Sequence, residues 1–244
     1  MDENIRIFEE QYTVDQLEPS TAHRYDRQMV ALRRDLLGRH VRGRALDLCC
    51  GTGAYSVTPS ASTIGLDGSA QMLTEHRARS GGDAILTQGD ARSLPFSTSS
   101  FDSVYALTAL YLVPDLPRAM EEIRRVLRPG GVAVLELGNR RSLNTLIVRR
   151  HHVRSGWAQT HALPLGTLRR LIAAIGTVVE WHSFQVLPML RPGPGQWWLL
   201  PMAHPAWKSP LSAGSDGRML DEHLSSTRAL RGVAFRHLVV VRRS

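Results

Sequence analysis

Lysine is almost absent from this chain of 244 residues: all of its 30 basic residues except Lys208 are arginine. This skew is typical of a GC-rich genome, and no array of lysines interleaved with aromatic residues indicates a nucleic-acid partner. No apolar run reaches the roughly 18 to 20 residues that a membrane-spanning helix requires. The first residues also lack the basic start and apolar core of a secretory signal. We therefore expect a cytoplasmic protein without a membrane segment.

Cysteine is almost as scarce, with only Cys49 and Cys50 present. We expect both on one buried strand, where adjacent side chains point to opposite faces, and we expect no disulfide between them. The pattern indicates two reduced core residues. We expect no metal site and no redox chemistry here.

Acidic residues become rare in the second half of the chain. The formal net charge is +8, but residues 1–136 carry 15 arginines against 18 acidic residues, net −3. Residues 137–244 carry 15 basic residues against 4 acidic ones, net +11. This basic part suits a ligand that bears a carboxylate or phosphate, and by charge alone it leaves an RNA partner open.

The most informative segment is Ala45-Leu-Asp-Leu-Cys-Cys-Gly-Thr-Gly-Ala54, which predicts a buried strand running into a tight glycine turn. A second apolar run, residues 63–67, ends at Asp67, 20 residues after Asp47. A carboxylate at the end of a second parallel strand can accept hydrogen bonds from both hydroxyls of a ribose. The turn and the acid together indicate an adenosine-containing cofactor at the carboxyl edge of a doubly wound sheet.

The glycine turn lacks the third glycine of a dinucleotide site, since it reads Gly51-Thr-Gly53-Ala-Tyr-Ser56. Asp47 would also repel a pyrophosphate, whereas it suits an ammonium group. The chain resembles the class I S-adenosylmethionine-dependent methyltransferases of small-molecule type, similar to the ubiquinone- and menaquinone-biosynthesis group. Their first motif is acid-x-Gly-x-Gly-x-Gly, and Cys49 stands at its first glycine, where we expect a mild change that demands only a φ below zero.

The resemblance continues in order over roughly residues 40 to 138, through the segments 65–73, 89–96, 101–115 and 121–131. It implies S-adenosylmethionine as the cofactor, with Asp67 on the ribose and Met72 near the adenine. It further implies that Asp90 accepts from the adenine amino group and that the Ala91 amide meets the ring. The complete set of cofactor-binding residues that we expect is Tyr12, Asp47, Cys49, Gly51, Gly53, Asp67, Gly68, Met72, Asp90, Ala91 and Thr108.

The predicted fold is α/β: a doubly wound, Rossmann-like sheet of seven strands, mostly parallel with an antiparallel edge strand. We expect one domain over residues 1–244, with an N-terminal helical cap (1–40), a cofactor-binding core (41–138) and a substrate cap with a terminal hairpin (139–244). Between Gly53 and Ile64 there is room for only a shortened helix. Strands are expected at 44–49, 63–67, 84–88, 102–107, 132–137, 177–184 and 232–242, and helices at 21–38, 69–79, 116–127 and 168–176.

Methyl transfer from a sulfonium needs mainly orientation, so a catalytic base is not obligatory. Candidate bases are His161, His152 and Tyr111, each of which is also compatible with a surface or packing role. Asn139 suits either an acceptor contact or a helix cap. The long segment 185–231, rich in proline and tryptophan, suits a lid or an interface.

We expect a biosynthetic methyltransferase whose acceptor is a small molecule with an anionic group and an apolar or aromatic body. The alternatives are methylation of RNA or protein, or a fold-mate that binds the cofactor without methylating. We expect no nucleic-acid or membrane partner, and a monomer or homodimer. The acceptor and the atom that is methylated are open at this point.

Overall fold

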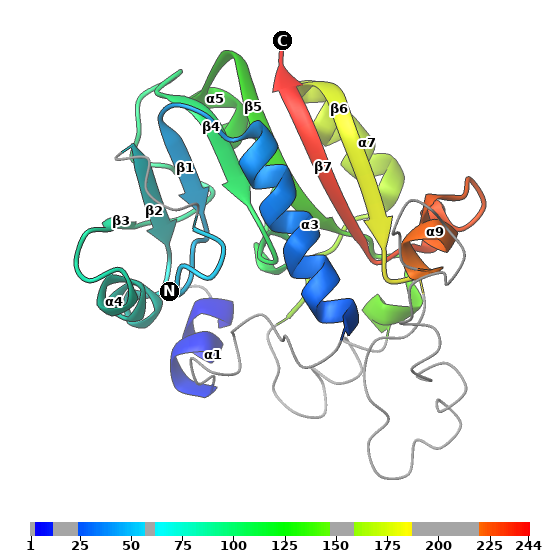
Figure 1. The fold of residues 1–244 in the computed structure, drawn as a ribbon, viewed down its shortest axis with the longest axis horizontal. Helices are drawn as coiled ribbons and strands as arrows, with labels where there is room; N and C mark the ends of the chain where they lie inside the picture. Colours follow the sequence, from blue (N-terminus) through cyan, green and yellow to red (C-terminus); the bar gives the residue numbers. More distant parts are fainter. Residues whose placement is uncertain (1–2, 12–23, 57–61, 147–158, 187–219) are drawn as a thin grey trace.

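The computed structural model describes residues 3–11, 24–56, 62–146, 159–186 and 220–244 (Figure 1). In this part of the chain seven strands form one sheet in the order β3-β2-β1-β4-β5-β7-β6. The strands are β1 Ala45–Leu48, β2 Thr63–Asp67, β3 Ile85–Gln88, β4 Phe101–Ala106, β5 Leu127–Gly138, β6 Gly176–Phe184 and β7 Arg236–Arg243. The helices are α1 Glu3–Gln11, α3 Arg24–His40, α4 Ala70–Arg79, α5 Leu116–Val126, α7 Leu165–Ile175 and α9 Leu220–Ser226, with short 3₁₀ turns η1 Leu110–Leu112 and η4 Arg231–Val233.

The predicted seven-stranded, mostly parallel sheet is confirmed. Strands β1 to β5 pair in parallel, and β7 pairs antiparallel with both β5 and β6. The antiparallel strand therefore lies between β5 and β6, as the expected terminal hairpin requires. Strand β5 begins at Leu127 rather than at residue 132, because Leu127 already pairs with Phe101 of β4, ahead of a register shift that precedes Val132.

Helices cover both faces of the sheet, α3 on one side and α5 with α7 on the other (Figure 1). On the α3 side, Met29, Leu36 and Leu37 pack against Val134 and Val240. The opposite core is larger and joins alternate residues of the central strands to the apolar faces of α5 and α7. Side chains alternate between the two faces of a strand. Since helices bury both faces of the central strands, the side chains on each face are apolar.

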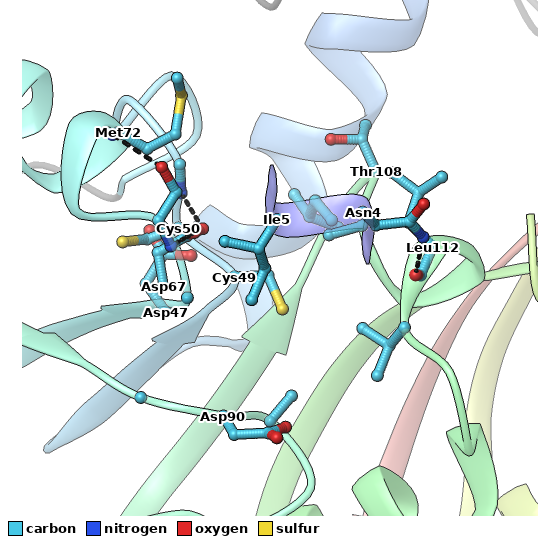
Figure 2. Close-up of a pocket in the computed structure, with 18 of the residues that line it drawn as sticks. Asn4, Ile5, Asp47, Cys49, Cys50, Asp67, Met72, Asp90, Thr108 and Leu112 are labelled. Atoms are coloured by element: carbon cyan, nitrogen blue, oxygen red, sulfur yellow. Dashed lines mark hydrogen bonds between the residues drawn. The ribbon is translucent and has the colours of Figure 1, made fainter. Parts of the chain in front are cut away.

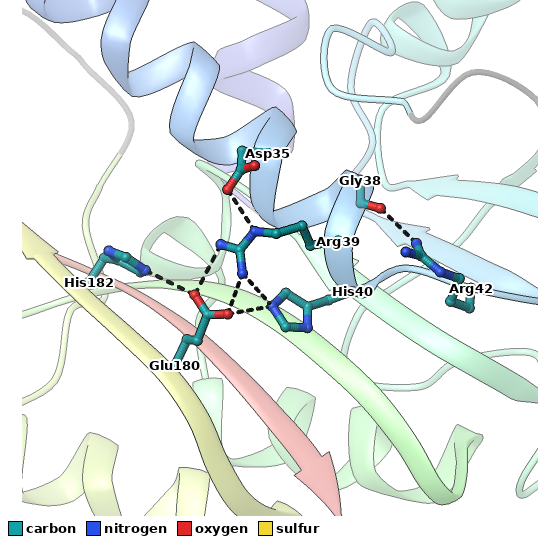
Figure 3. Close-up of polar contacts among 7 residues, drawn as sticks. All are labelled: Asp35, Gly38, Arg39, His40, Arg42, Glu180 and His182. Atoms are coloured by element: carbon teal, nitrogen blue, oxygen red, sulfur yellow. Dashed lines mark hydrogen bonds and ion pairs between the residues drawn. The ribbon is translucent and has the colours of Figure 1, made fainter. Parts of the chain in front are cut away.

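A polar cluster fastens α3 to strand β6 (Figure 3). Glu180 accepts from Arg39 Nη1 at 2.5 Å and from Arg39 Nη2 at 3.1 Å, and His40 Nε2 lies 2.7 Å from the same carboxylate. The third neighbour, His182, lies 3.3 Å away. Hydrogen bonds from Arg39 hold the pKa of Glu180 down at about 2, so the carboxylate is ionised throughout the neutral range.

The amino-terminal helix α1 falls within the expected helical cap of residues 1–40, but it is not predicted from the sequence as a separate helix. It lies across the carboxyl ends of the strands, close to β1 and β2 (Figure 1). Residues 51–56 form turns without a helix, and the rest of that connection falls outside the described residues. None of the described helices is both long and apolar enough to cross a membrane.

Candidate functional site

A cavity of about 220 Å³, here called the edge cavity, opens where β1, β2, β3 and β4 end. Figure 2 shows Asp47 and Asp67 on one side of it, Thr108 and Leu112 on the other, and Ile5 of α1 between them. The structure thus brings together nine of the residues expected from the sequence: Asp47, Cys49, Gly51, Asp67, Gly68, Met72, Asp90, Ala91 and Thr108.

Asp67 ends β2 and anchors the glycine turn. Its Oδ2 accepts from the Gly51 amide at 2.8 Å, and its Oδ1 accepts from the Ser69 amide at 2.9 Å. Burial raises the pKa of Asp67, while these amide hydrogen bonds act in the opposite direction. Each carboxylate oxygen can accept more than one hydrogen bond, so Asp67 retains capacity toward two neighbouring hydroxyls.

Asp47 is the most deeply placed acid of the cavity, with 4% of its surface exposed. Burial raises its pKa to about 7, against hydrogen bonds from Ser56 and Tyr105 that lower it. The Ser56 hydroxyl donates to Asp47 Oδ2 at 2.8 Å. No basic side chain of the described residues forms an ion pair with Asp47. A carboxylate buried in this way is stabilised by a ligand that brings a positive charge.

The glycine turn corrects one expectation. Cys49 has a φ of +57°, so the prediction of a φ below zero is wrong. Left-handed backbone is strained for a residue with a Cβ, which explains why the motif prefers glycine there. Both cysteines are free and directly follow β1 instead of lying on it. Gly53, at φ +82°, is absent from the cavity lining, and a Cβ there would lie 2.5 Å from His76 Nε2.

Asp90 is engaged by its neighbour Arg92. The Arg92 side chain donates to Asp90 Oδ2 at 2.7 Å and to Oδ1 at 3.0 Å, and these bonds lower the pKa of Asp90. Met72 and Ala91 are buried beside them, at 4% and 6% exposure. The Asp90 carboxylate can accept hydrogen bonds, and the buried side chains beside it are apolar. This combination suits a flat, nitrogen-rich ring.

Among the cavity residues that sequence reasoning missed are Asn4 and Ile5 of α1. The Asn4 side chain donates to the Leu112 carbonyl at 2.6 Å and to the Gln159 carbonyl at 2.9 Å. It also accepts from the Gln159 amide at 2.7 Å. A Cβ on Gly68 would clash with Ile5 Cδ1, so a larger residue there would require the Ile5 side chain to move. The available signal was weak: Ile5 and Phe8 are apolar and spaced by about one helical turn.

The candidate bases are placed differently from one another. His161 lies in a wider neighbouring cavity of about 880 Å³, the outer cavity, which shares Asn4, Gly68 and Asp90 with the edge cavity. Its amide donates to the Tyr111 carbonyl at 2.7 Å. Tyr111 is absent from the lining of both cavities. Tyr12 and His152 lie outside the described residues.

Asn139 has a tethering role in this structure. Its side-chain amide donates to the carbonyls of Gly232 and Ala234, at 2.8 and 3.0 Å, and its Oδ1 accepts from the Arg141 amide. The residue is fully buried. Among the described residues, no group of three or more histidine, cysteine or acidic side chains could hold a metal ion.

Comparison of the sequence with known proteins gives a partial match. Residues 46–135 match the family described as "Methyltransferase domain". The chain is 41% identical over 99 residues to demethylmenaquinone methyltransferase of Staphylococcus carnosus. This match covers 37% of the chain and 41% of the relative, so it spans well under two thirds of the relative's length.

Solved structures match over much more of the chain. A S-adenosylmethionine-dependent methyltransferase of Thermotoga maritima, described as a possible histamine N-methyltransferase, aligns with a TM-score of 0.59 at 20% identity. The alignment covers 88% of this chain and 89% of that protein. The [4+2]-cyclase SpnF aligns with a TM-score of 0.55 at 20% identity, over 89% of this chain and 80% of that protein. At such identities the likeness establishes the fold alone.

Proposed function

We propose that this protein transfers a methyl group from S-adenosylmethionine to a small-molecule acceptor, a proposal supported by the match of residues 46–135 to the family described as "Methyltransferase domain". The observation that carries the proposal is the convergence of Asp47, Asp67 and Asp90 on one cavity. They lie at or just beyond the carboxyl ends of three neighbouring parallel strands, where α/β sheets bind ligands.

The acidic lining suits the proposed cofactor because Asp47 forms no ion pair with any basic side chain of the described residues. Asp47 is buried with its pKa raised to about 7 by burial, and it would pair with the ammonium of the cofactor's amino-acid part. Asp67 would accept from the ribose hydroxyls, while Asp90 and the Ala91 amide would meet the adenine. Met72 would pack against the same ring. When bound, S-adenosylmethionine supplies a methyl group on a positively charged sulfur.

The chain's own contribution to the reaction is orientation and exclusion of water. Helix α1 covers the cavity through Ile5 and is held by the three hydrogen bonds of Asn4. Orientation of two reactants for in-line displacement is worth an effective molarity of about 10⁵ to 10⁸ M. His161, in the adjoining outer cavity, is our candidate for accepting a proton from a hydroxyl acceptor.

The acceptor class follows from what adjoins the edge cavity. The outer cavity is large enough for a small organic molecule and is lined by His161, Gln159 and Pro114. Aromatic acids are acceptors to test because they carry the expected anionic group, and demethylmenaquinone is a second class, since the relative from Staphylococcus carnosus is a demethylmenaquinone methyltransferase. The likeness to the cyclase SpnF means that the same fold is compatible with chemistry other than methylation.

The test is methyl transfer itself. The protein is incubated with S-adenosylmethionine and, in turn, demethylmenaquinone, catechol-type phenols and aromatic acids, and products are identified by mass spectrometry. We expect one acceptor to gain a single methyl group, with an equal amount of S-adenosylhomocysteine formed, and the Asp67→Ala variant to form neither. If the protein binds S-adenosylhomocysteine but converts the substrate without adding a methyl group, the assignment to methyl transfer is wrong.

A further inference from the structure

Beside the edge cavity lies a buried group of three charges, here called the arginine–glutamate cluster: Arg33, Glu136 and Arg236. Arg33 of α3 donates through Nε to Glu136 Oε2 at 2.8 Å and through Nη2 to Oε1 at 3.0 Å. Glu136 is fully buried, and it also receives a hydrogen bond from the Thr108 backbone. Both oxygens of the only carboxylate in the cluster are therefore already engaged.

Arg236 is left without an equivalent partner. Its Nη1 approaches Glu136 Oε1 only to 3.6 Å, beyond hydrogen-bond distance. Among the described residues, neither its Nε nor its Nη1 has a hydrogen-bond partner, although both atoms are buried. The guanidinium carbon lies 3.4 Å from the Tyr111 ring centroid and 4.5 Å from that of Phe235. The aromatic rings fix the position of the charge but satisfy none of its N–H groups.

The cluster carries a surplus positive charge. Arginine remains protonated in proteins, so two guanidinium groups face one carboxylate. An unpaired buried cation is unfavourable, which makes such a surplus a candidate binding site for an anion. The side chain of Arg236 keeps 13% of its surface exposed.

The position of the cluster joins it to the edge cavity. Arg236 begins β7 opposite Gly138, at the carboxyl edge of the sheet. Tyr55 lines the edge cavity, and its hydroxyl lies 3.2 Å from Arg33 Nη1. Thr108 also lines the cavity and binds Glu136 through its backbone. Two cavity residues are thus in direct contact with the cluster, Tyr55 through Arg33 and Thr108 through Glu136.

We propose that Arg236 binds a carboxylate of the acceptor, while Arg33 and Glu136 neutralise each other beside it. This inference rests on the proposed function and assigns the charged subsite of the same reaction. A carboxylate fits better than a phosphate because a single surplus charge is neutralised by a monoanion, whereas a phosphate brings about −1.5 to −2. Tyr111 and Phe235 beside the guanidinium suit an acceptor with an aromatic body.

The experiment uses the full chain with benzoate as the probe, measured by saturation-transfer NMR with and without S-adenosylhomocysteine. Benzamide is the neutral isostere and phenyl phosphate the dianion. We expect benzoate to bind in the millimolar range and benzamide to bind at least about tenfold more weakly. A tenfold ratio corresponds to a difference of about 1.4 kcal/mol in binding free energy. Arg236→Gln is expected to abolish the preference for benzoate, and Arg236→Lys to keep part of it.

The matched control is Arg242→Gln, an exposed arginine of the same strand, which should bind benzoate as the unmodified protein does. Circular dichroism verifies that each variant is folded, and Arg236→Lys carries the test if Arg236→Gln does not fold. Equal binding of benzoate and benzamide, or unchanged benzoate binding in both Arg236 variants, overturns the proposal. Tighter binding of phenyl phosphate than of benzoate overturns the carboxylate assignment.

S-adenosylhomocysteine affinity separates this proposal from the proposed function. Its binding should be unchanged within about twofold in Arg236→Gln, since Arg236 does not line the edge cavity. If the unmodified protein does not bind S-adenosylhomocysteine, the proposed function fails. If it binds S-adenosylhomocysteine but does not distinguish benzoate from benzamide, only the anion subsite fails.

Discussion

Arg33 and Glu136, 103 residues apart in the chain, form a doubly hydrogen-bonded ion pair that joins helix α3 to strand β5. Burial alone would raise the pKa of Glu136, but the charge and hydrogen bonds of Arg33 bring it below its usual range. The ion pair therefore stabilises the fold at any pH above the pKa that a glutamate has in the unfolded chain. This stabilisation is lost as the pH falls through the lower pKa of Glu136 in the folded protein. The pair thus ties α3 to the centre of the sheet.

Removing Glu136 should destabilise the protein more than removing Arg33. Glu136→Gln leaves both Arg33 and Arg236 without a carboxylate, and we expect it to lower the free energy of unfolding by about 3–5 kcal/mol. Arg33→Met should lower it less, because Glu136 keeps Arg236 as a neighbour. Urea unfolding measures both. Glu121→Gln, at an exposed pair with Arg118, is the control and should change the value by less than about 1 kcal/mol. A larger loss in Arg33→Met than in Glu136→Gln contradicts this account of the cluster.

Cofactor affinity should depend on pH through Asp47. Burial raises its pKa to about 7, so at lower pH the free protein holds it neutral, whereas the ammonium of S-adenosylmethionine favours the ionised form. From about pH 5.5 to about pH 7 the ammonium stays protonated, and we expect binding to tighten as the pH rises, with release of a proton. Calorimetry in two buffers of different ionisation enthalpy measures that proton. In Asp47→Asn the binding should be weak and independent of pH. If the unmodified protein binds the cofactor without releasing a proton, this account of Asp47 is wrong.

Cys49 should tolerate glycine better than alanine. Its φ of +57° is strained for any residue with a Cβ, at a cost of roughly 1–2 kcal/mol. We expect Cys49→Gly to be more stable than Cys49→Ala, and the order to reverse at neighbouring Cys50, where glycine has only its entropic disadvantage. Thermal unfolding of the four variants decides the matter. The same order at both positions would show that strain at Cys49 is negligible.

Asn4 should matter for cofactor affinity because it holds α1 over the edge cavity. Asn4→Ala removes three hydrogen bonds to the segments around Leu112 and Gln159, each worth about 0.5–1.5 kcal/mol. We expect S-adenosylhomocysteine to bind at least about tenfold more weakly in calorimetric titration. Arg6→Ala, on an exposed position of the same helix, should bind as the unmodified protein does. Equal affinities in the two variants would mean that α1 does not close the site.

Much of the site was predictable because its signals are local. The alternation of strands and helices predicts the parallel sheet, and Asp47 and Asp67 meet at one edge once β1 and β2 pair. The position of Asp90 after β3 follows from the same rule. These residues are read from motifs a few residues long, so no knowledge of distant packing is needed.

The remainder depends on contacts between distant parts of the chain. Arg33, Glu136 and Arg236 come from three separate regions, and each alone is indistinguishable from a surface charge in the sequence. Asn4 belongs to a short helix that is stabilised by its contacts with residues 112 and 159 rather than by its own periodicity. The left-handed backbone of Cys49 was misjudged because a cysteine in a glycine position does not reveal the φ that it adopts.

The most direct test of the central claim is calorimetric titration of the protein with S-adenosylhomocysteine. We expect one saturable site with micromolar affinity, weakened about 100-fold in Asp67→Ala, which loses two hydrogen bonds from ribose hydroxyls to a charged acceptor. Asp83→Ala, at an exposed loop position, should leave the affinity unchanged. Absence of binding, or equal binding by the unmodified protein and Asp67→Ala, contradicts the assignment of the edge cavity as the cofactor site.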